Sequence, residues 1–457
     1  MTLARELVKA LRSACGRPLP ENVALAARLH LLDASGVGLA SAGSPVGAAY
    51  RGFALGVAKG GAATVFGQAS GATSADAALI NGGLIHSLEF DDTHTASIVH
   101  GSAVIAAASL AVGEAQGASG AALLGAYARG WEVLIRFGLA SPLGFQSRGY
   151  QTTSVGGTLA AALVTSELAG LTEDQSVAAI GISLSQASGV FEFLTNGSSV
   201  KSLHPGWAAH GGVVAALLAR SGMTGPETSL EGRYGLFRQF AGDDAAPARF
   251  RALIGDIGHQ WHLPNAAYKF YPCCHYLHPF IEAAGILAER GVRADDVIRI
   301  LCRVPAPEAG IICDPWESKQ APETGHAGRW SLPIVVAARL IEGKVDLATF
   351  ESPASATVRE LAGRMRWEPL PDARFPARFE AEIVCETRAG PTQTVRIDDV
   401  YGNHTRPPGA DPIMAKFRAN AARSLQAEAI ASVERAAEGL MAARDLGAFS
   451  KALRQVR

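Results

Sequence analysis

Charged side chains are scarce in this sequence of 457 residues: Asp, Glu, Lys and Arg together make up 18%, and the formal net charge is −1. There is no basic stripe or polybasic run, so we expect neither nucleic acid nor a membrane surface as a partner. The apolar share is 48% and there are 50 glycines, a composition typical of a compact globular enzyme rather than a disordered chain. The length favours two domains over a single core.

Long hydrophobic runs are also missing. No stretch reaches the ~18 uninterrupted apolar residues that a membrane-spanning helix needs. The Ala-rich segments at 104–115 and 156–170 predict buried helices instead. The start of the sequence lacks the apolar region and cleavage site of a secretory signal. The 6 cysteines are scattered without a Cys-x-x-Cys pair, which predicts reduced thiols in a cytoplasmic protein.

The hydrophobic periodicity changes once along the chain. Residues 1–265 repeatedly carry apolar residues at helical spacing, and Thr172 followed by Gln175 predicts a capping box. Residues 297–305 and 377–397 alternate and are rich in β-branched side chains, the second segment with a turn at 388–391. We therefore predict a mainly α protein with a large all-helical domain at 1–265 and a smaller α+β lid domain at 266–404. A C-terminal helix at 405–457 is expected to pack back on the first domain.

The stretch LEFDDTHTASIVHGSA, residues 88–103, concentrates titratable groups inside an apolar region. Three carboxylates and two imidazoles fall within it: Glu89, Asp91, Asp92, His94 and His100. Such a set can supply a general base, a general acid and an environment shaped for an anion. Alternatively, the carboxylates could cap a helix that begins at Thr93 or Thr95.

Two further clusters carry lysine or histidine. Lys201 and His204 precede Pro205-Gly206 and an apolar helix, so Lys201 is either held for an anionic ligand or exposed at the surface. His275 and His278 lie beside vicinal cysteines. No second pair of ligands at zinc spacing accompanies them, so we expect no metal there but an acid/base or a core histidine.

A fourth cluster, residues 147–162, places glycines and hydroxyl side chains at the start of an apolar helix. Free N–H groups there form a possible anion site. The Gly-x-Gly-x-x-Gly spacing of dinucleotide-binding loops is absent, as are Gly-x-Ser-x-Gly, the Walker A motif and His-Glu-x-x-His. We therefore expect no dinucleotide cofactor.

Three motifs in fixed order resemble the MmgE/PrpD family: residues 89–94 (EFDDTH), 201–206 (KSLHPG) and 271–275 (YPCCH). The likeness runs from residues 31–40 to 326–337. Members include 2-methylcitrate dehydratases, cis-aconitate decarboxylases and iminodisuccinate epimerase. The resemblance implies a helical domain with a smaller α+β domain, a homodimer, and chemistry without metal or organic cofactor.

The resemblance also assigns residues. The acidic position before the Asp pair falls on Glu89, the lysine is Lys201 and the late histidine is His278, while Thr93 and His100 match the positions after the pair. One departure stands out, because many members carry histidine where this chain has Gln151. Glutamine cannot titrate but can donate a hydrogen bond to a substrate, which weakens the assignment as a decarboxylase.

Together these features predict acid/base chemistry on a small polycarboxylate substrate. Developing charge next to a carboxylate must be neutralised, a role we assign to Lys201 with Thr93. His100 or His278 is the expected base, and the other histidine, Glu89 or Asp92 is the expected acid. The remaining residues are expected to bind or orient the substrate: Asp91, His94, Gln151, His204 and His275.

The first hypothesis is a hydro-lyase of the 2-methylcitrate dehydratase kind. The alternatives are an epimerase of the iminodisuccinate kind, a decarboxylase of the cis-aconitate kind, and a dimeric carboxylate-binding protein without enzymatic activity.

Overall fold

The computed structural model describes residues 1–56, 60–195 and 197–454. Contacts divide the chain into two compact units. The first comprises Met1–Ser87, Asp91–Ala266 and Gly409–Arg457, and the second comprises Leu88–Phe90 and Ala267–Pro408. Along the chain, the second unit therefore lies between segments of the first, and it includes the first three residues of the LEFDDTH stretch.

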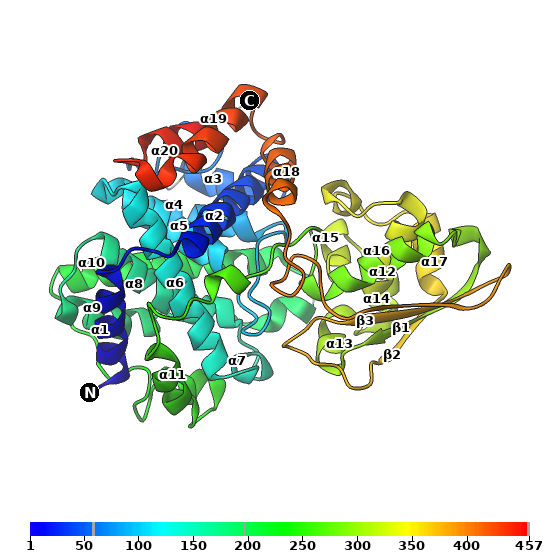
Figure 1. Cartoon of the computed structure of the whole chain (residues 1–457), viewed down its shortest axis with the longest axis horizontal. Coiled ribbons are helices and arrows are strands. Elements are labelled where there is room, and N and C mark those ends of the chain that lie inside the picture. Colours follow the sequence, from blue (N-terminus) through cyan, green and yellow to red (C-terminus); the bar gives the residue numbers. More distant parts are fainter. Residues whose placement is uncertain (57–59, 196, 455–457) are drawn as a thin grey trace. The chain divides into compact units, whose positions relative to one another are not determined.

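Among the residues that the structure describes, the regular elements of the first unit are all helices (Figure 1). Its α-helices before the insertion are α1 (Leu3–Cys15), α2 (Glu21–Ala42), α3 (Ala48–Gly56), α4 (Ser74–His86), α5 (Gly101–Gln116), α6 (Gly120–Ala140), α7 (Gly144–Ser147), α8 (Thr152–Leu168), α9 (Glu173–Leu184), α10 (Leu203–Arg220) and α11 (Ala246–Ile254). Short turns of helix are η1 (Phe191–Thr195), η2 (Ser199–Ser202), η3 (Phe237–Ala241) and η4 (Leu263–Asn265). After the insertion come α18 (Ala410–Ala421), α19 (Ala427–Glu438), η8 (Leu440–Ala442) and α20 (Gly447–Leu453).

Small side chains let the central helices approach closely. Helix α10 packs against both α4 and α8. A methyl group on Gly82 of α4 would lie 2.7 Å from the Cα atom of Gly206 on α10, so neither position has room for a larger residue. This contact brings the start of α10 close to α4, which ends at His86, and so brings together parts of two sequence motifs.

The C-terminal segment packs on α2, as Figure 1 shows for α18, drawn in orange, beside the dark blue helix. The tail was predicted as one helix, and this is wrong, because it is broken between Ala421 and Ala427 and again after Glu438. Ser424 in the first break donates to the carbonyl of Leu39 at 2.6 Å, so the backbone is held out of the helix by a contact with α2.

Helix α2 is long and apolar enough to cross a membrane by length and composition, and it is the one such helix in the described ranges. In this fold, 78% of its apolar window is buried inside the protein. It is therefore accounted for as a core helix of the first unit.

The second unit contains a four-stranded mixed sheet in the order β2-β1-β3-β4. The strands are β1 (Val297–Val304), β2 (Met365–Pro369), β3 (Ala381–Thr387) and β4 (Gln393–Ile397). The helices are η5 (His275–Leu277), α12 (His278–Glu289), η6 (Ala294–Asp296), α13 (Ala306–Ile312), α14 (Trp316–Gln320), α15 (Gly325–Gly328), α16 (Leu332–Glu342), η7 (Leu347–Phe350) and α17 (Ala356–Gly363). Strand β1 pairs parallel to β2, with Ile300 opposite Met365, and antiparallel to β3.

Several local predictions are confirmed. Strands β3 and β4 form an antiparallel hairpin, with Ile383 opposite Val395, around the predicted turn. Thr172 and Gln175 form the predicted capping box at the start of α9. The predicted fold class, mainly α with a smaller α+β part, is also confirmed.

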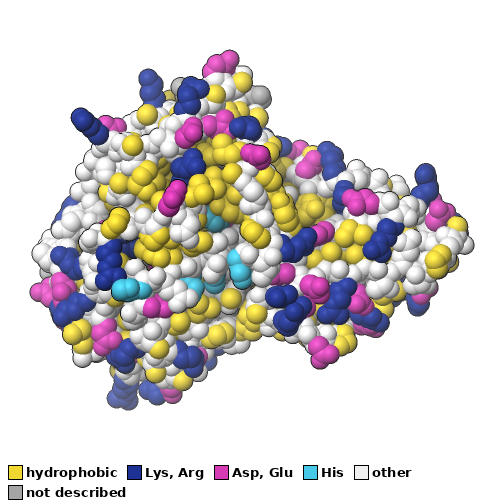
Figure 2. Space-filling view, in the orientation of Figure 1, with side chains coloured by type: hydrophobic (Ala, Val, Ile, Leu, Met, Phe, Trp, Pro, Cys, Tyr) yellow, Lys and Arg dark blue, Asp and Glu magenta, His cyan; other side chains and the backbone are white. Residues whose placement is uncertain are grey.

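Charges of both signs are intermingled on the face of the molecule shown in Figure 2. No basic stripe crosses the described residues on that face. This agrees with the balance of 41 basic and 42 acidic residues in the sequence.

Candidate functional site

The segment between α4 and α5 is a loop, and it is almost entirely buried. His94 and Val99 form an isolated antiparallel bridge across it, with the amide of His94 donating to the carbonyl of Val99 at 2.9 Å. The side chain of His94 also hydrogen-bonds Ser97 at 2.8 Å, which fixes the turn. The alternative that the carboxylates cap a helix beginning at Thr93 or Thr95 is therefore wrong, because α5 begins at Gly101.

Asp92 explains where that helix begins. Its carboxylate accepts a hydrogen bond from the amide of Ser102, ten residues later, at 3.2 Å. It also accepts from the hydroxyl of Ser102 and lies 2.7 Å from Nδ1 of His30 on α2. Capping by a carboxylate is thus real, but it acts on the first turn of α5 from a distance along the chain. Asp92 is 1% exposed and is tied to the core by these donors.

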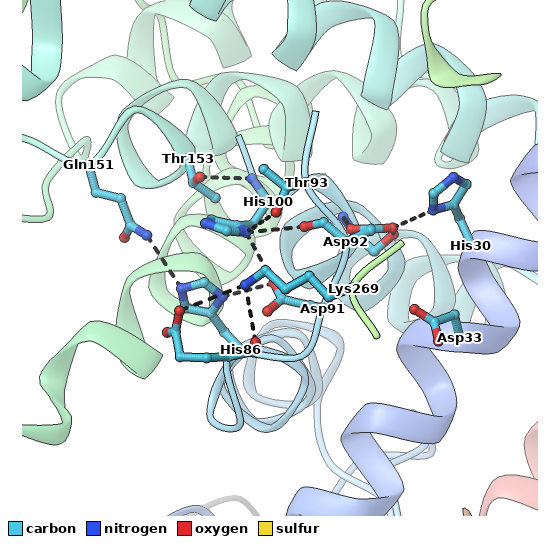
Figure 3. Close-up of polar contacts among 12 residues, drawn as sticks. His30, Asp33, His86, Asp91, Asp92, Thr93, His100, Gln151, Thr153 and Lys269 are labelled. Atoms are coloured by element: carbon cyan, nitrogen blue, oxygen red, sulfur yellow. Dashed lines mark hydrogen bonds and ion pairs between the residues drawn. The ribbon is translucent and has the colours of Figure 1, made fainter. Parts of the chain in front are cut away.

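Asp91 faces a different pair of groups (Figure 3). Its carboxylate lies 2.8 Å from Nδ1 of His86 and 3.9 Å from Nδ1 of His100. The two imidazole rings are 4.9 Å apart between centroids. His86 and Asp91 have no exposed side-chain surface, whereas His100 is 13% exposed. We call His86, Asp91 and His100 the proton-transfer cluster.

The backbone sets the tautomer of His100. Its Nδ1 lies 3.1 Å from the carbonyl oxygen of Asp92, which can only accept, so that nitrogen carries the hydrogen. The hydroxyl of Thr93 lies 3.0 Å from the same nitrogen. The amide of His100 donates to the hydroxyl of Thr153 at the start of α8, at 3.0 Å. In the neutral ring, Nε2 is then the basic nitrogen.

Gln151 and His204 extend the cluster. Gly149, at φ 80, makes the turn that leads into α8 and sets Gln151 at its N-cap. The amide oxygen of Gln151 lies 2.7 Å from Nδ1 of His204, and its amide nitrogen lies 3.4 Å from Nε2 of His86. Burial, followed by the neighbouring His86 and Lys201, lowers the pKa of His204 to about 4. His204 is therefore neutral near pH 7.

Lys201 lies in η2, just before α10, and only 8% of it is exposed. The alternative that it is a surface lysine is therefore wrong. Its ammonium is close enough to His204 to contribute to the lowered pKa of that ring. A buried ammonium next to the neutral imidazole of His204 is suited to an anionic ligand.

In the second unit, two buried cations hold the Leu88–Phe90 segment. The ammonium of Lys269 donates to the carbonyl of Glu89 at 3.1 Å and lies 3.9 Å from its carboxylate. Arg329 donates to the carbonyl of Leu88 at 2.7 Å. Glu89 itself has a φ of 52, a left-handed conformation that costs energy in a residue with a side chain. The contacts with the two buried cations hold Glu89 in this strained conformation.

His275 and His278 also belong to the second unit and are both buried. Their rings are 4.7 Å apart, and His278 packs edge-on against Tyr271 at 5.2 Å. His278 lines a cavity of about 230 Å³ together with Tyr271, Glu282, Tyr401 and Arg406.

Among the described residues, the proton-transfer cluster is the group whose ligand atoms lie close enough together to hold a metal ion. The two cysteines and two histidines at 273–278 are not such a group. In His86, Asp91 and His100 these atoms all lie within 4.8 Å of one another.

Two of the predicted residues, Asp91 and His100, thus belong to the proton-transfer cluster. Three more lie next to it: Thr93, Gln151 and His204. The sequence did not single out His86, His30, Lys269 or Arg329. A histidine in an otherwise apolar helix was the available signal for His30 on α2 and for His86 at the end of α4, because an imidazole is seldom buried without a partner. Lys269 and Arg329 gave no comparable signal.

Comparison with known proteins adds a family and several relatives. The model of the MmgE/PrpD N-terminal domain matches residues 5–248, and that of the MmgE/PrpD C-terminal domain matches residues 271–439. A protein named cis-aconitate decarboxylase-like protein oryM, from Aspergillus oryzae, is 29% identical over 394 residues, covering 81% of this chain and 80% of that protein. The human protein named cis-aconitate decarboxylase is 29% identical over 396 residues, covering 83% of this chain and 79% of that protein. One of the same name from Aspergillus terreus is 26% identical, covering 73% of this chain and 70% of that protein.

Proposed function

The chain belongs to the MmgE/PrpD family, and within that family we propose that it is a cofactor-free acid/base lyase acting on a small polycarboxylate. The reaction that we propose is the loss of water, as in a hydro-lyase of the 2-methylcitrate dehydratase kind. The observation that carries the proposal is the proton-transfer cluster, in which one partly exposed imidazole lies against a buried carboxylate and a second imidazole.

His100 is the base in this proposal. Its Nδ1–H is donated to the carbonyl of Asp92, which leaves Nε2 to take a proton from the carbon next to a substrate carboxylate. The imidazolium that forms is stabilised by Asp91, whose carboxylate lies 3.9 Å away. The C–H electron pair becomes the new C=C bond as the β C–O bond breaks, and the hydroxyl leaves as water with the proton that the His100 imidazolium returns to it.

Lys201 supplies the counter-charge. Removing a proton next to a carboxylate places more negative charge on an anionic group, so a buried cation lowers the barrier. Lys201 is buried beside His204, which is neutral near pH 7 and does not compete with it for the anion. We assign Lys201 to the substrate carboxylate and Thr93 to orienting His100.

Decarboxylation is the second candidate, and the names of the relatives favour it. In that reaction the C–CO₂ bond breaks, and the imidazolium of His100 protonates the carbanion. Against it stands Gln151, which has no titratable proton and lies where many family members carry histidine. This substitution is our reason for placing dehydration first.

Proton NMR in D₂O with 2-methylcitrate, citrate, cis-aconitate and iminodisuccinate tests the proposal. We expect loss of water to give either a new vinyl proton, as from citrate, or, from 2-methylcitrate, a methyl singlet on the new double bond in place of the methyl doublet. Release of CO₂ from cis-aconitate would establish the decarboxylase instead, and deuterium wash-in with inversion would establish the epimerase. Tight binding of a polycarboxylate without turnover would show a carboxylate-binding protein and contradict the lyase.

We also propose that the protein is a cytoplasmic homodimer, since the resemblance implies a dimer and the six cysteines form no disulfide. Light scattering on a sizing column should then give about twice the chain mass of 47.5 kDa. A mass of one chain across micromolar concentrations would contradict the dimer.

A further inference from the structure

The side-chain amide of Gln151 lies between two imidazoles, with His204 at its oxygen and His86 at its nitrogen. All three side chains are buried. An amide has one end that accepts and one end that donates. It can therefore satisfy two imidazoles only if one of the facing nitrogens carries hydrogen and the other does not.

Asp91 determines which of the facing imidazole nitrogens carries a hydrogen. A carboxylate accepts only, so Nδ1 of His86, 2.8 Å from Asp91, must carry a hydrogen. Nε2 of the same ring faces the NH₂ group of Gln151 and accepts its hydrogen, so this nitrogen carries no hydrogen of its own. On the other side, the amide oxygen takes the hydrogen of Nδ1 of His204 at 2.7 Å. His86 is then a neutral Nδ1–H ring. His204 also carries its hydrogen on Nδ1, and its pKa, lowered to about 4 chiefly by burial, keeps that ring neutral near pH 7.

We propose that Gln151 is a positioning residue that holds His86 and His204 as neutral Nδ1–H tautomers, so that His100 is the imidazole of the cluster that exchanges a proton with the substrate. The proposal rests on the lyase function above and deepens it, because it assigns the proton to one ring of three. The lowered pKa of His204 agrees with a neutral ring. The charged groups that face these rings within the first unit include Asp91 and Lys201.

Two substitutions of Gln151 should change the protonation states of His86 and His204 in different ways. Gln151→Glu puts a carboxylate in the place of the amide, and a carboxylate accepts from both sides. His86 would then carry hydrogen on both nitrogens and become an imidazolium. Gln151→Met keeps the length of the side chain but removes both amide groups. His204 should then populate both neutral tautomers, while His86 keeps its Nδ1–H because Asp91 still accepts it.

Imidazole ¹⁵N NMR on histidine-labelled free enzyme at pH 7 reads these states directly, with signals assigned from His86→Asn and His204→Asn. We expect two neutral Nδ1–H rings in the wild type, an imidazolium at His86 in Gln151→Glu, and mixed tautomers at His204 in Gln151→Met. Gln175→Glu is the matched control, since Glu preserves the capping box at that position, and its ring signals should match the wild type.

An imidazolium or an Nε2–H tautomer at His86 in the wild type would overturn the proposal. So would a single Nδ1–H tautomer of His204 that persists in Gln151→Met. Because this measurement needs no substrate, it can fail while the lyase proposal stands, and the reverse also holds. If Gln151→Glu does not fold, the wild-type and Gln151→Met spectra still decide.

Kinetics on the substrate identified by the NMR panel provide the second test. Gln151→Glu should lower kcat by about 10²-fold, the lower end of what an acid/base group contributes, with KM changed less than about threefold. A purely structural role would instead leave kcat per folded molecule unchanged. That result would overturn the positioning role.

Discussion

At the scale of single residues, neighbouring carboxylates have separate tasks. Asp91 and Asp92 are adjacent, but the first contacts His86 and the second contacts His30 and Ser102. Neither carboxylate is left as an isolated buried charge, which would be costly in an apolar interior. This division lets one carboxylate serve the imidazoles while the other fixes the start of α5.

The first prediction concerns His100. His100→Gln removes the proposed base, so kcat/KM should fall by about 10²- to 10⁴-fold. Far-UV circular dichroism should stay unchanged, because the ring is at the edge of the core and 13% exposed. The matched control is His210→Gln, a histidine on α10 that stacks on Trp207 instead. A kcat/KM of His100→Gln near the wild-type value would contradict the assignment of His100 as the base.

The second prediction concerns pH and His204. Its folded-state pKa of about 4 lies below its ordinary value of 6.5. The unfolded chain therefore binds the extra proton first as the pH falls. The stability that comes from the neutral ring is present above pH 6.5 and is lost between 6.5 and 4, up to roughly 3 kcal/mol.

Urea unfolding at a series of pH values tests this, with His204→Asn as the comparison because Asn cannot titrate. The free energy of unfolding of the wild type should fall more steeply with acid than that of the variant between pH 6.5 and 4. Parallel curves would show that His204 does not carry this linkage.

How much of the site the sequence predicts depends on how far apart the partners are. Asp91, His100 and Gln151 lie in motifs and could be selected. His86 lies five residues before its partner Asp91, yet the contact depends on where α4 ends. His30 lies 62 residues from Asp92, and nothing local in either segment indicates the pairing.

At the scale of elements, the C-terminal helix α18 is fastened to α2 by a buried ion pair. The ammonium of Lys416 lies 2.8 Å from the carboxylate of Asp33, with side chains 5% and 0% exposed. Burial lowers the pKa of Lys416 and raises that of Asp33, and the charge of Asp92 raises the pKa of Asp33 further. The pair therefore links the tail of the chain electrostatically to the residue that caps α5.

The third prediction tests this link. Lys416→Met leaves Asp33 as an uncompensated buried carboxylate, which should cost about 3–5 kcal/mol in the free energy of unfolding. Adding Asp33→Leu to the same chain should recover most of that loss, because an apolar pair of similar volume is often neutral or stabilising. Urea unfolding of the two single variants and the double variant gives the coupling. Additive losses would mean that the ion pair does not join the two helices.

Local signals predicted elements well when the deciding contact was local. The capping box of Thr172 and Gln175 spans three residues, and the β3–β4 hairpin closes over a short turn. The alternative of a helix beginning at Thr93 is wrong because the carboxylate of Asp92 accepts from the amide of Ser102, in the first turn of α5, instead. Likewise, the break after Ala421 follows from a contact of Ser424 with α2, far away in the sequence.

At the scale of the whole molecule, the second unit is inserted into the first. The C-terminal helices return to the first unit, and Leu88–Phe90 groups with the second. Lys269 and Arg329, which contact this short segment, lie 180 and 241 residues away from their partners. Composition and periodicity predict helices and strands, but they do not predict which unit a segment such as Leu88–Phe90 joins.

The final prediction concerns what the whole molecule needs for activity. The ligand atoms of His86, Asp91 and His100 are close enough together to hold a metal ion. Both nitrogens of His86 nevertheless form hydrogen bonds, Nδ1 with Asp91 and Nε2 with Gln151. A metal ion bound to His86 would have to displace the Nδ1 hydrogen or turn the side-chain amide of Gln151 away from Nε2. His100 likewise donates its Nδ1–H to the carbonyl of Asp92. We therefore expect that dialysis against EDTA or 1,10-phenanthroline leaves kcat/KM unchanged, and that elemental analysis finds far less than one metal ion per active chain. Loss of activity that a divalent cation restores would overturn this, and would make the cluster a metal centre rather than a proton-transfer site.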